Sequence, residues 1–213
     1  MKAYFISGLG ADKKAFYKLK LPAGYEVVYL DWITPQPKES LKNYAHRFSH
    51  FIEEKEDFIL VGLSLGGMIA AEIARIKPPK KLILLSTVSS SIEMPWYFRW
   101  AGKAGIHKVI PTGLYKRMTI INHFMGSKSK TDKAIVLSFV KQVDPSFIQW
   151  AINAILEWNQ HEPLDNSIHI HGSKDRLLPH RYTKASYIIE NGRHLMVLNK
   201  ADAINKILEE VLQ

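Results

Sequence analysis

A serine flanked by glycines is the residue of this chain best suited to act as a nucleophile. Residues 62–66 read Gly-Leu-Ser-Leu-Gly, and they lie between a short apolar run and a helical pattern. On the sharp turn of a nucleophile elbow, side chains two residues before and after the serine would collide, and Gly62 and Gly66 remove them. The pattern therefore predicts that Ser64 stands at the start of a helix whose dipole favours a developing oxyanion.

A serine hydroxyl needs a general base at neutral pH, and that base needs a carboxylate to orient it. In Gly-x-Ser-x-Gly hydrolases the chain order is serine, acid, histidine. Asp175 and His194 follow Ser64 in that order, each in a loop after an apolar strand pattern. Taken singly, Asp175 is as readily a surface carboxylate and His194 a capping or packing residue. At the one sheet edge where open α/β sheets hold their active sites, the three together predict a catalytic triad.

The elements that would position these residues alternate between strands and helices. Apolar runs typical of buried strands cover residues 3–7, 25–30, 58–61, 81–85, 167–171 and 185–189. Amphipathic helical patterns cover residues 41–52, 68–75 and 201–212. Strands separated by helices imply right-handed crossovers and a sheet covered on both faces. The sequence therefore predicts an α/β fold with a mostly parallel, doubly wound sheet.

The strand pattern stops between residues 89 and 162. Helical patterns replace it at residues 96–125, 130–143 and 145–158. The third of these has the residues of a favourable helix N-terminus, because Asp144 is a good N-cap and Pro145 suits the first helical position. We therefore predict an all-helical cap, or lid, over residues 89–165. It would be inserted into a hydrolase core formed by residues 1–88 and 166–213.

With these motifs in order, the chain resembles the α/β-hydrolase superfamily over nearly its whole length. It is most similar to small esterase- or thioesterase-like members that begin at the family's third strand and carry a helical cap after the sixth. The resemblance assigns Ser64 as nucleophile, Asp175 as the triad acid and His194 as the base. It also assigns the backbone N–H groups of Leu65 and Leu9 to the oxyanion hole. It implies hydrolysis of a small carboxylic ester or thioester through an acyl-enzyme, with no metal or organic cofactor.

Two features depart from the family pattern. Ser7-Gly8 stands where many members have His-Gly after the first strand. The interval from Asp175 to His194 is also short, which predicts that the helix usually found there is reduced to a turn. Neither departure removes a chemical group that the mechanism requires.

The predicted cap is rich in aromatic and basic residues. Candidates for lining a substrate pocket are Trp96, Tyr97, Phe98, Trp100, Phe124, Trp150 and Trp158. Aromatic residues at helical spacing are more often the core of such a cap. The formal net charge is +9, and residues 94–131 hold seven basic side chains and no acidic one. Such a stretch is usually a solvated surface, but as a rim it would attract an anionic substrate or carrier.

Two alternatives use the fold differently. The Gly-Leu-Gly turn at residues 8–10 follows a strand, and Asp31 ends the next one, as in a dinucleotide-binding oxidoreductase. Lys13 replaces the third glycine of that motif, which disturbs close packing of helix on strand. The other alternative is a non-catalytic ligand-binding protein built on a hydrolase scaffold.

Composition excludes or disfavours several other classes of protein and of functional site. The chain has no cysteine, which excludes a disulfide framework, a thiolate nucleophile and a cysteine-based zinc site. A metal site on His161, His169 and His171 is conceivable, although buried or surface histidines are the commoner reading. No apolar run approaches the ~20 residues of a membrane span, and no nucleic-acid-binding module accompanies the positive charge. We expect a cytoplasmic protein, and the pattern does not indicate its oligomeric state.

Overall fold

A six-stranded parallel sheet forms the centre of the computed structural model, which describes residues 1–53, 56–98, 100 and 129–213. The strands in sheet order are β2 (Glu26–Leu30), β1 (Lys2–Ile6), β3 (Phe58–Leu63), β4 (Lys81–Leu85), β5 (Ser167–Gly172) and β6 (Tyr187–Ile189). Every neighbouring pair is parallel. The predicted α/β class with a parallel sheet is confirmed.

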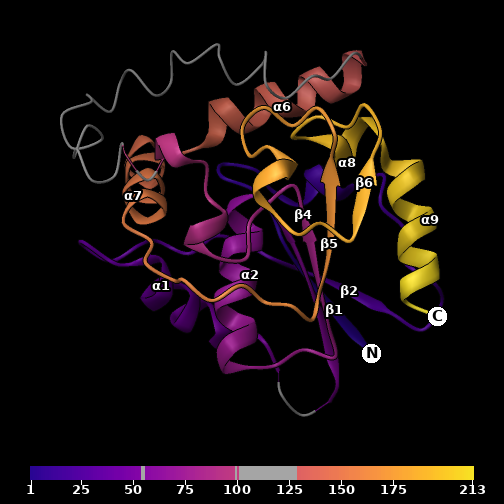
Figure 1. The fold of residues 1–213 in the computed structure, drawn as a ribbon, viewed down its shortest axis with the longest axis horizontal. Helices are drawn as coiled ribbons and strands as arrows, with labels where there is room; N and C mark the ends of the chain where they lie inside the picture. The colour runs from indigo at the N-terminus through magenta and orange to yellow at the C-terminus, as the bar shows by residue number, and fades with distance from the viewer. Residues whose placement is uncertain (54–55, 99, 101–128) are drawn as a thin grey trace.

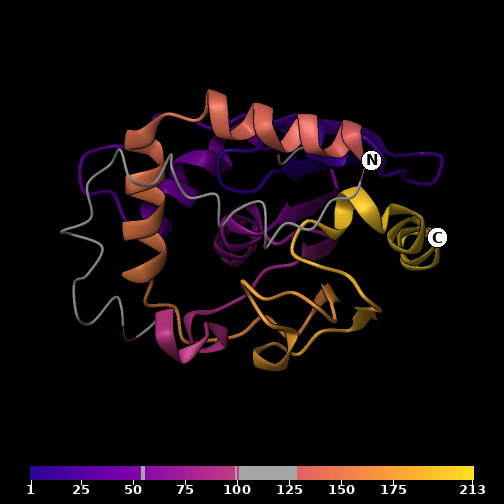
Figure 2. The same cartoon turned by 90° about the horizontal axis from the view of Figure 1, so that it is seen from above.

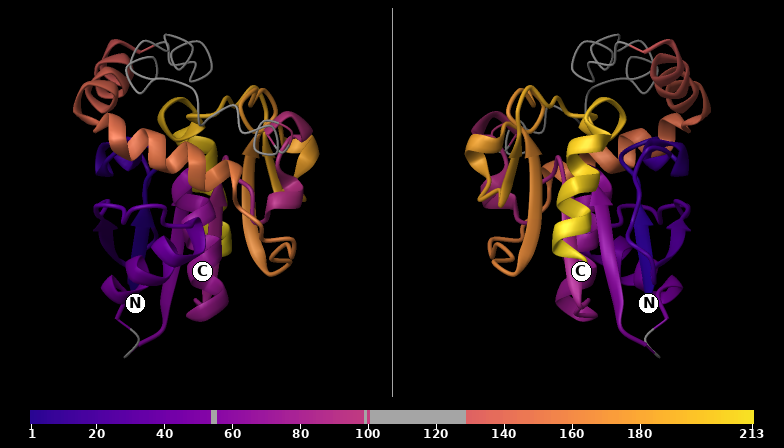
Figure 3. Two further views of the ribbon diagram at one scale, coloured as in Figure 1. Left: turned by 90° about the vertical axis from the view of Figure 1, so that its left-hand side faces the viewer. Right: turned by 90° about the vertical axis from the view of Figure 1, so that its right-hand side faces the viewer.

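Helices cover both faces of this sheet, as Figure 1 shows with α2 on one side and α9 on the other. The α-helices of the described chain are α1 (Leu41–Phe48), α2 (Leu65–Ile76), α6 (Lys130–Gln142), α7 (Pro145–Leu156), α8 (Met196–Asn199) and α9 (Ala201–Val211). Short 3₁₀ turns are η1 (Lys13–Phe16), η2 (Ser49–Phe51), η3 (Ser91–Glu93) and η5 (His180–Tyr182). The two views of Figure 3 look onto the two faces in turn, with α9 in front in the right-hand view.

The alternation of side chains along each strand creates a separate core on each face. On β3, Leu60 joins the core beneath α1 and α2, whereas Ile59 and Val61 join the core beneath α8 and α9. All six residues of β3 are buried, as expected of a central parallel strand. This burial on both faces makes β3 a rigid support for the turn that follows it.

The observed elements differ from the predicted ones mainly at their ends. The helix predicted over residues 41–52 ends at Phe48, and its last turn tightens into η2. Helix α2 begins at Leu65, three residues before the predicted start, because the turn at Ser64 leads directly into it. The strand predicted over 185–189 begins at Tyr187, because the Ser186 hydroxyl accepts the His169 N–H in place of a ladder bond. The predicted reduction of the helix between Asp175 and His194 to a turn is confirmed, since the one helical segment in that interval is the three-residue turn η5.

Helices α6 and α7 lie between β4 and β5 in the sequence and meet at a corner above the sheet (Figure 2). Helix α7 packs on α1, with the Trp150 and Tyr44 rings 4.3 Å apart between centroids. Helix α6 is tied to the segment after η1, where Lys18 Nζ lies 2.8 Å from the buried Asp132 carboxylate. The helices predicted within residues 96–125 fall almost wholly outside the described residues. The division into core and cap at residues 89 and 165 remains a prediction.

Among the described residues, no helix is both long enough and apolar enough to cross a membrane.

Candidate active site

Ser64 occupies the single-residue turn between β3 and α2. Its backbone has φ 53° and ψ −120°, a left-handed conformation that is strained for a residue with a side chain. Four hydrogen bonds hold the turn: Ser64 N–H donates to Leu85 O, and Ser64 O accepts from the N–H groups of Gly67 and Met68 and from Thr87 Oγ1 at 2.6 Å. The surrounding backbone therefore fixes the direction in which the Ser64 hydroxyl points.

The glycines around Ser64 are required by close approaches of the backbone. A Cβ atom at Gly66 would collide with the carbonyl groups of Ile6 and Ser7, and one at Gly62 would lie 2.5 Å from Gly67 Cα. Gly67 must also be a glycine, because a Cβ atom there would overlap the Thr87 side chain. The sequence pattern identified Gly62 and Gly66 but not the roles of Gly67 and Thr87, although the doubled glycine was a signal for a second close contact.

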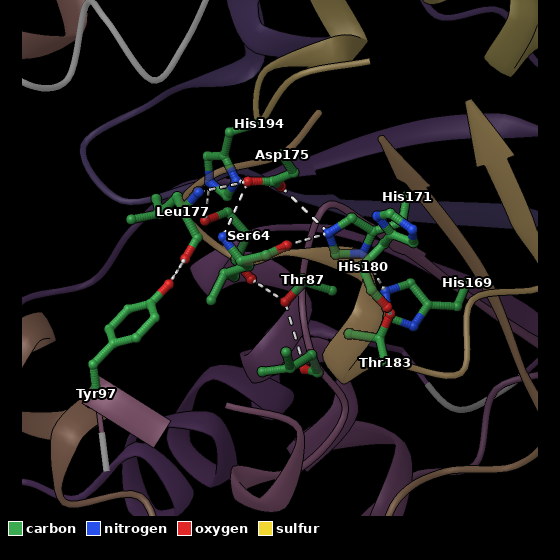
Figure 4. Close-up of polar contacts among 12 residues, drawn as sticks. Ser64, Thr87, Tyr97, His169, His171, Asp175, Leu177, His180, Thr183 and His194 are labelled. Atoms are coloured by element: carbon green, nitrogen blue, oxygen red, sulfur yellow. Dashed lines mark hydrogen bonds and ion pairs between the residues drawn. The ribbon is translucent and has the colours of Figure 1, made fainter. Parts of the chain in front are cut away.

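The structure brings Ser64, His194 and Asp175 together from three separate segments (Figure 4). His194, in the loop between β6 and α8, places Nε2 2.9 Å from Ser64 Oγ. Its Nδ1 lies 2.8 Å from Asp175 Oδ2. His194 and Asp175 are buried, whereas Ser64 is only partly so. A continuous hydrogen-bonded path therefore runs from a buried carboxylate to a partly exposed hydroxyl.

Asp175 is held by both of its carboxylate oxygens. Oδ1 accepts the backbone N–H groups of Leu177 and Leu178 at 2.9 and 3.0 Å, while Oδ2 faces His194. Burial alone would raise the pKa of Asp175. The positive charge available on His194, together with hydrogen bonds from His171 and His194, outweighs burial and holds the pKa below its ordinary value. The carboxylate therefore stays ionised at neutral pH.

Two further histidines extend this network behind Asp175. His171 Nε2 lies 2.6 Å from Leu178 O and 3.3 Å from Asp175 Oδ2, and its Nδ1 lies 3.2 Å from His169 Nε2. Both rings are buried. Burial and the neighbouring His171 lower the pKa of His169 to about 3, against a hydrogen bond to the Thr87 backbone that favours the protonated ring. The predicted shared strand face of these two residues is confirmed, but the sequence did not reveal their contact with Asp175.

Of the two predicted oxyanion donors, Leu65 directly follows Ser64 in the chain. Leu65 is the first residue of α2, so its N–H is among those a helix leaves without a partner within itself. The other donor lies on the loop after β1, which passes close to Ser64: a Cβ at Gly8 would lie 3.4 Å from Ser64 Cβ.

The loop after β1 is ordered by the residue that departs from the family pattern. Ser7 Oγ donates to Ala11 O at 2.6 Å, and Trp32 Nε1 donates to the same carbonyl at 3.0 Å. Ala11 N–H in turn donates to Gly8 O. Only the four-residue turn η1 follows, so no long helix starts here as a dinucleotide-binding motif requires.

The predicted pocket aromatics separate into two groups. Trp150 and Trp158 are in the core, where their Nε1 atoms donate to Glu39 O and to Glu72 Oε1. Phe98 packs partly against the same core. Trp96 and Trp100 are exposed, and Tyr97 reaches towards the site with its hydroxyl 3.4 Å from Leu177 O. Phe124 lies outside the described residues.

The histidines considered for a metal site do not assemble one. His169 and His171 face each other, whereas His161 is exposed on the segment after α7. Across the described parts of the chain, no group of three or more histidine or acidic side chains is arranged to hold a metal ion.

Comparisons with known proteins agree on one fold. The model of the alpha/beta hydrolase family matches residues 3–207. No curated protein matches the chain significantly. Solved structures are similar at low identity. A lipase-esterase related protein from Clostridium acetobutylicum has TM-score 0.70 and 16% identity, over 97% of this chain and 92% of that one.

Two other similar structures are those of an esterase and of an enol-lactonase. A thermophilic esterase from Thermogutta terrifontis has TM-score 0.71 and 14% identity, covering 100% of this chain and 89% of that one. An enol-lactonase from Burkholderia xenovorans has TM-score 0.70 and 13% identity, covering 97% and 89%. At these identities the likeness shows the fold alone.

Proposed function

The chain belongs to the alpha/beta hydrolase family, and we propose that it is a serine hydrolase that cleaves a small carboxylic ester or thioester. The observation that carries this proposal is the unbroken path Ser64 Oγ–His194 Nε2, His194 Nδ1–Asp175 Oδ2, with separations of 2.9 and 2.8 Å. A nucleophile, a base within hydrogen-bond reach and a group that orients the base are the elements of covalent acyl transfer.

The tautomer of His194 follows from its partners. Asp175 Oδ2 is an acceptor with a carboxylate that stays ionised, so the proton of a neutral His194 belongs on Nδ1. Nε2 is then left with its lone pair towards Ser64 Oγ. This is the form needed to accept the serine proton during attack.

The reaction would proceed in two balanced halves. Ser64 Oγ attacks the carbonyl carbon while His194 Nε2 takes its proton, and the oxyanion accepts hydrogen bonds from the N–H groups of Leu65 and Leu9. The C–O or C–S bond then breaks, and His194 returns the proton to the leaving alcohol or thiol. Water attacks the acyl-enzyme by the same route, releasing the carboxylic acid and restoring Ser64.

The substrate side of the proposal rests on the cap. Tyr97 reaches the Asp175–Leu177 loop through its hydroxyl, which donates to Leu177 O (Figure 4). The Trp96 ring contacts the Tyr97 ring, so these two residues are our candidates for contact with the acyl or leaving group. The run of basic residues from 94 to 131 suits a substrate or carrier with negative charge. If neutral short-chain esters turn over as fast as coenzyme A thioesters, with no response to salt, the basic rim has no role in selection.

The central test is covalent labelling of Ser64. A fluorophosphonate should label the wild-type protein at Ser64, and a p-nitrophenyl ester should show a burst of product. Ser64→Ala should abolish both, while Ser129→Ala, which removes an exposed hydroxyl with no capping hydrogen bond, should leave both intact. A wild-type protein that is folded, unlabelled and inactive across a panel of esters and thioesters would instead favour a non-catalytic binding protein on this scaffold.

A further inference from the structure

The second proposed oxyanion donor, Leu9 N–H, lies on a four-residue turn after β1. Gly8 O accepts the Ala11 N–H at 2.9 Å, which closes a β-turn over residues 8–11. Gly10 has φ 68°, whereas the φ of Leu9 is negative. A negative φ followed by a positive one at the two central positions is the pattern of a type II turn, and the second of these positions favours glycine. Leu9 and Gly10 therefore form the tip of this 8–11 turn.

The contacts that the core makes with the 8–11 turn fix its two ends. Ser7 Oγ and Trp32 Nε1 both donate to Ala11 O, at 2.6 and 3.0 Å. At the other end, a Cβ atom on Gly8 would lie 3.4 Å from Ser64 Cβ. These contacts determine where the turn begins and ends, but none of them touches its tip.

A residue of the predicted cap packs on the tip. A Cβ atom on Gly10 would lie 3.1 Å from both Cβ and Cγ2 of Val143, and 3.5 Å from its Cγ1. The isopropyl group of Val143 therefore occupies the place that a side chain at position 10 would take. Because Gly10 has no side chain, this contact acts directly on the backbone of the turn.

Val143 is held in place by the helix that it follows. Residues 143 and 144 form the corner between α6 and α7 (Figure 2). The Val143 N–H donates to Phe139 O at 3.1 Å, which continues the hydrogen bonds of α6, and Asp144 caps α7 by accepting the Ser146 N–H. The Val143 side chain also packs, partly buried, against the core beneath α1 and α2. These contacts fix its isopropyl group over the turn.

We propose that Val143 is a positioning residue of the oxyanion hole, which holds the tip of the 8–11 turn so that Leu9 N–H points at the oxyanion. The predicted cap then contributes to the chemical step as well as to the choice of substrate. This inference rests on the proposed function, because Leu9 N–H is an oxyanion donor only if acyl transfer takes place at Ser64. The contact between Val143 and the turn exists without any substrate.

The size of the effect follows from what an oxyanion donor does. Removing one such donor typically costs about 10²–10³ in kcat, and displacing a reacting group by about 1 Å can cost about 10². Truncating Val143 leaves Leu9 N–H in the chain but frees the tip that carries it, so the expected loss is smaller, about tenfold in kcat. KM should change little, because the oxyanion exists only in the transition state and the tetrahedral intermediate.

The first arm of the test measures the turn without using activity. The Ala11 N–H closes the turn, so its hydrogen exchange reports how often the turn opens. Val143 is only partly buried, so Val143→Ala should fold, and it should speed exchange at Ala11 by about tenfold. Val143→Thr keeps the branched shape of the side chain and should leave that exchange rate close to the wild-type value.

Ile155→Ala is the matched control. Ile155 lies near the other end of α7, about 15 Å along that helix from the corner. Like Val143, it packs partly buried against the core beneath α1 and α2. Its truncation therefore loosens the packing of the predicted cap without removing the contact on Gly10, and exchange at Ala11 should not change.

The second arm measures kcat and KM separately with an activated ester. Val143→Ala should lower kcat by about tenfold, whereas Val143→Thr and Ile155→Ala should stay within about twofold of the wild type. A trifluoromethyl ketone forms a hemiketal oxyanion on the nucleophilic serine. Its inhibition constant should rise in Val143→Ala by the same factor by which kcat falls.

The two arms separate the possible failures. Unchanged exchange at Ala11 in Val143→Ala overturns the proposal, and so does an equal loss of kcat in Ile155→Ala. A rise in KM alone would make Val143 a substrate contact and overturn its positioning role. A wild-type protein without esterase activity contradicts the proposed function, and the exchange rates then still decide whether Val143 holds the turn.

Discussion

Asp175 and its partners are fixed by directional hydrogen bonds, whereas α7 is held on the core by aromatic packing. Each oxygen of the Asp175 carboxylate has assigned donors, from Leu177 and Leu178 on one side and from His194 on the other. On α7, Phe147 and Trp150 form an aromatic cluster with Trp32 and Tyr44. The ring centroids of Trp32 and Phe147 are 5.3 Å apart, and those of Tyr44 and Trp150 are 4.3 Å apart. The first arrangement specifies chemistry and the second specifies only where a helix lies.

This contrast explains why the two regions differ in how well sequence predicts them. A hydrogen-bonded site requires particular residue types in a particular order, so a small number of residues identifies it. Aromatic packing requires only bulk and apolar surface, and a tryptophan in a pocket has the same sequence pattern as one in a core. The comparison can be tested by removing one group from each region.

The largest expected effect is on catalysis, from Asp175→Asn. The asparagine can still accept the N–H groups of Leu177 and Leu178 through its oxygen, so the loop keeps its shape. Its amide cannot hold the tautomer of His194 that leaves Nε2 free, and kcat should fall by about 10⁴-fold. Steady-state kinetics on a p-nitrophenyl ester would measure this.

Asp165→Asn is the matched control, because it removes an 80% exposed carboxylate shortly before β5. Its kcat should equal that of the wild type. A loss of less than tenfold in Asp175→Asn, with the fold intact, would mean that the carboxylate does not orient the base.

Trp150→Ala should have the opposite effect to Asp175→Asn. It should lower the stability of the fold greatly and change kcat little. The Trp150 side chain is only 9% exposed, contacts the Tyr44 ring and donates to Glu39 O. Truncation should lower the free energy of unfolding by about 3–5 kcal/mol, as for other buried tryptophans. Urea denaturation would measure this loss. A change below about 1 kcal/mol would mean that α7 is not anchored through this ring.

Much of the fold and of the proposed triad could be predicted from the sequence because the signals were local. The strand patterns predicted every strand of the described sheet, and the elbow glycines marked contacts that backbone geometry imposes. The His171–Asp175 contact was not accessible, because it depends on how the loop after β5 folds back over that strand. The burial of Trp150 and Trp158 likewise depends on where the helix docks, which periodicity does not encode.

Acid should weaken the protein through Asp175. Since the folded state holds the pKa of this carboxyl below its unfolded value, the stabilisation is present above the unfolded pKa. It is lost progressively as pH falls below about 4, where the unfolded chain begins to bind the proton first. Thermal midpoints between pH 6 and pH 3 should therefore fall less steeply in Asp175→Asn than in the wild type. Equal slopes would show that Asp175 is not stabilised as an anion in the folded state.

The smallest expected effect on stability is that of Trp96→Ala, and it is the sharpest test of the contrast between core and pocket tryptophans. Trp96 is 62% exposed, and its ring contacts Tyr97, whose hydroxyl reaches the loop that carries Asp175. The free energy of unfolding should change by less than about 0.5 kcal/mol. If Trp96 contacts substrate, KM for a hydrophobic ester should rise several-fold, with Trp96→Phe restoring much of the loss because a ring remains. An unchanged KM removes Trp96 from the pocket, and a stability loss like that of Trp150→Ala would show that both tryptophans are core.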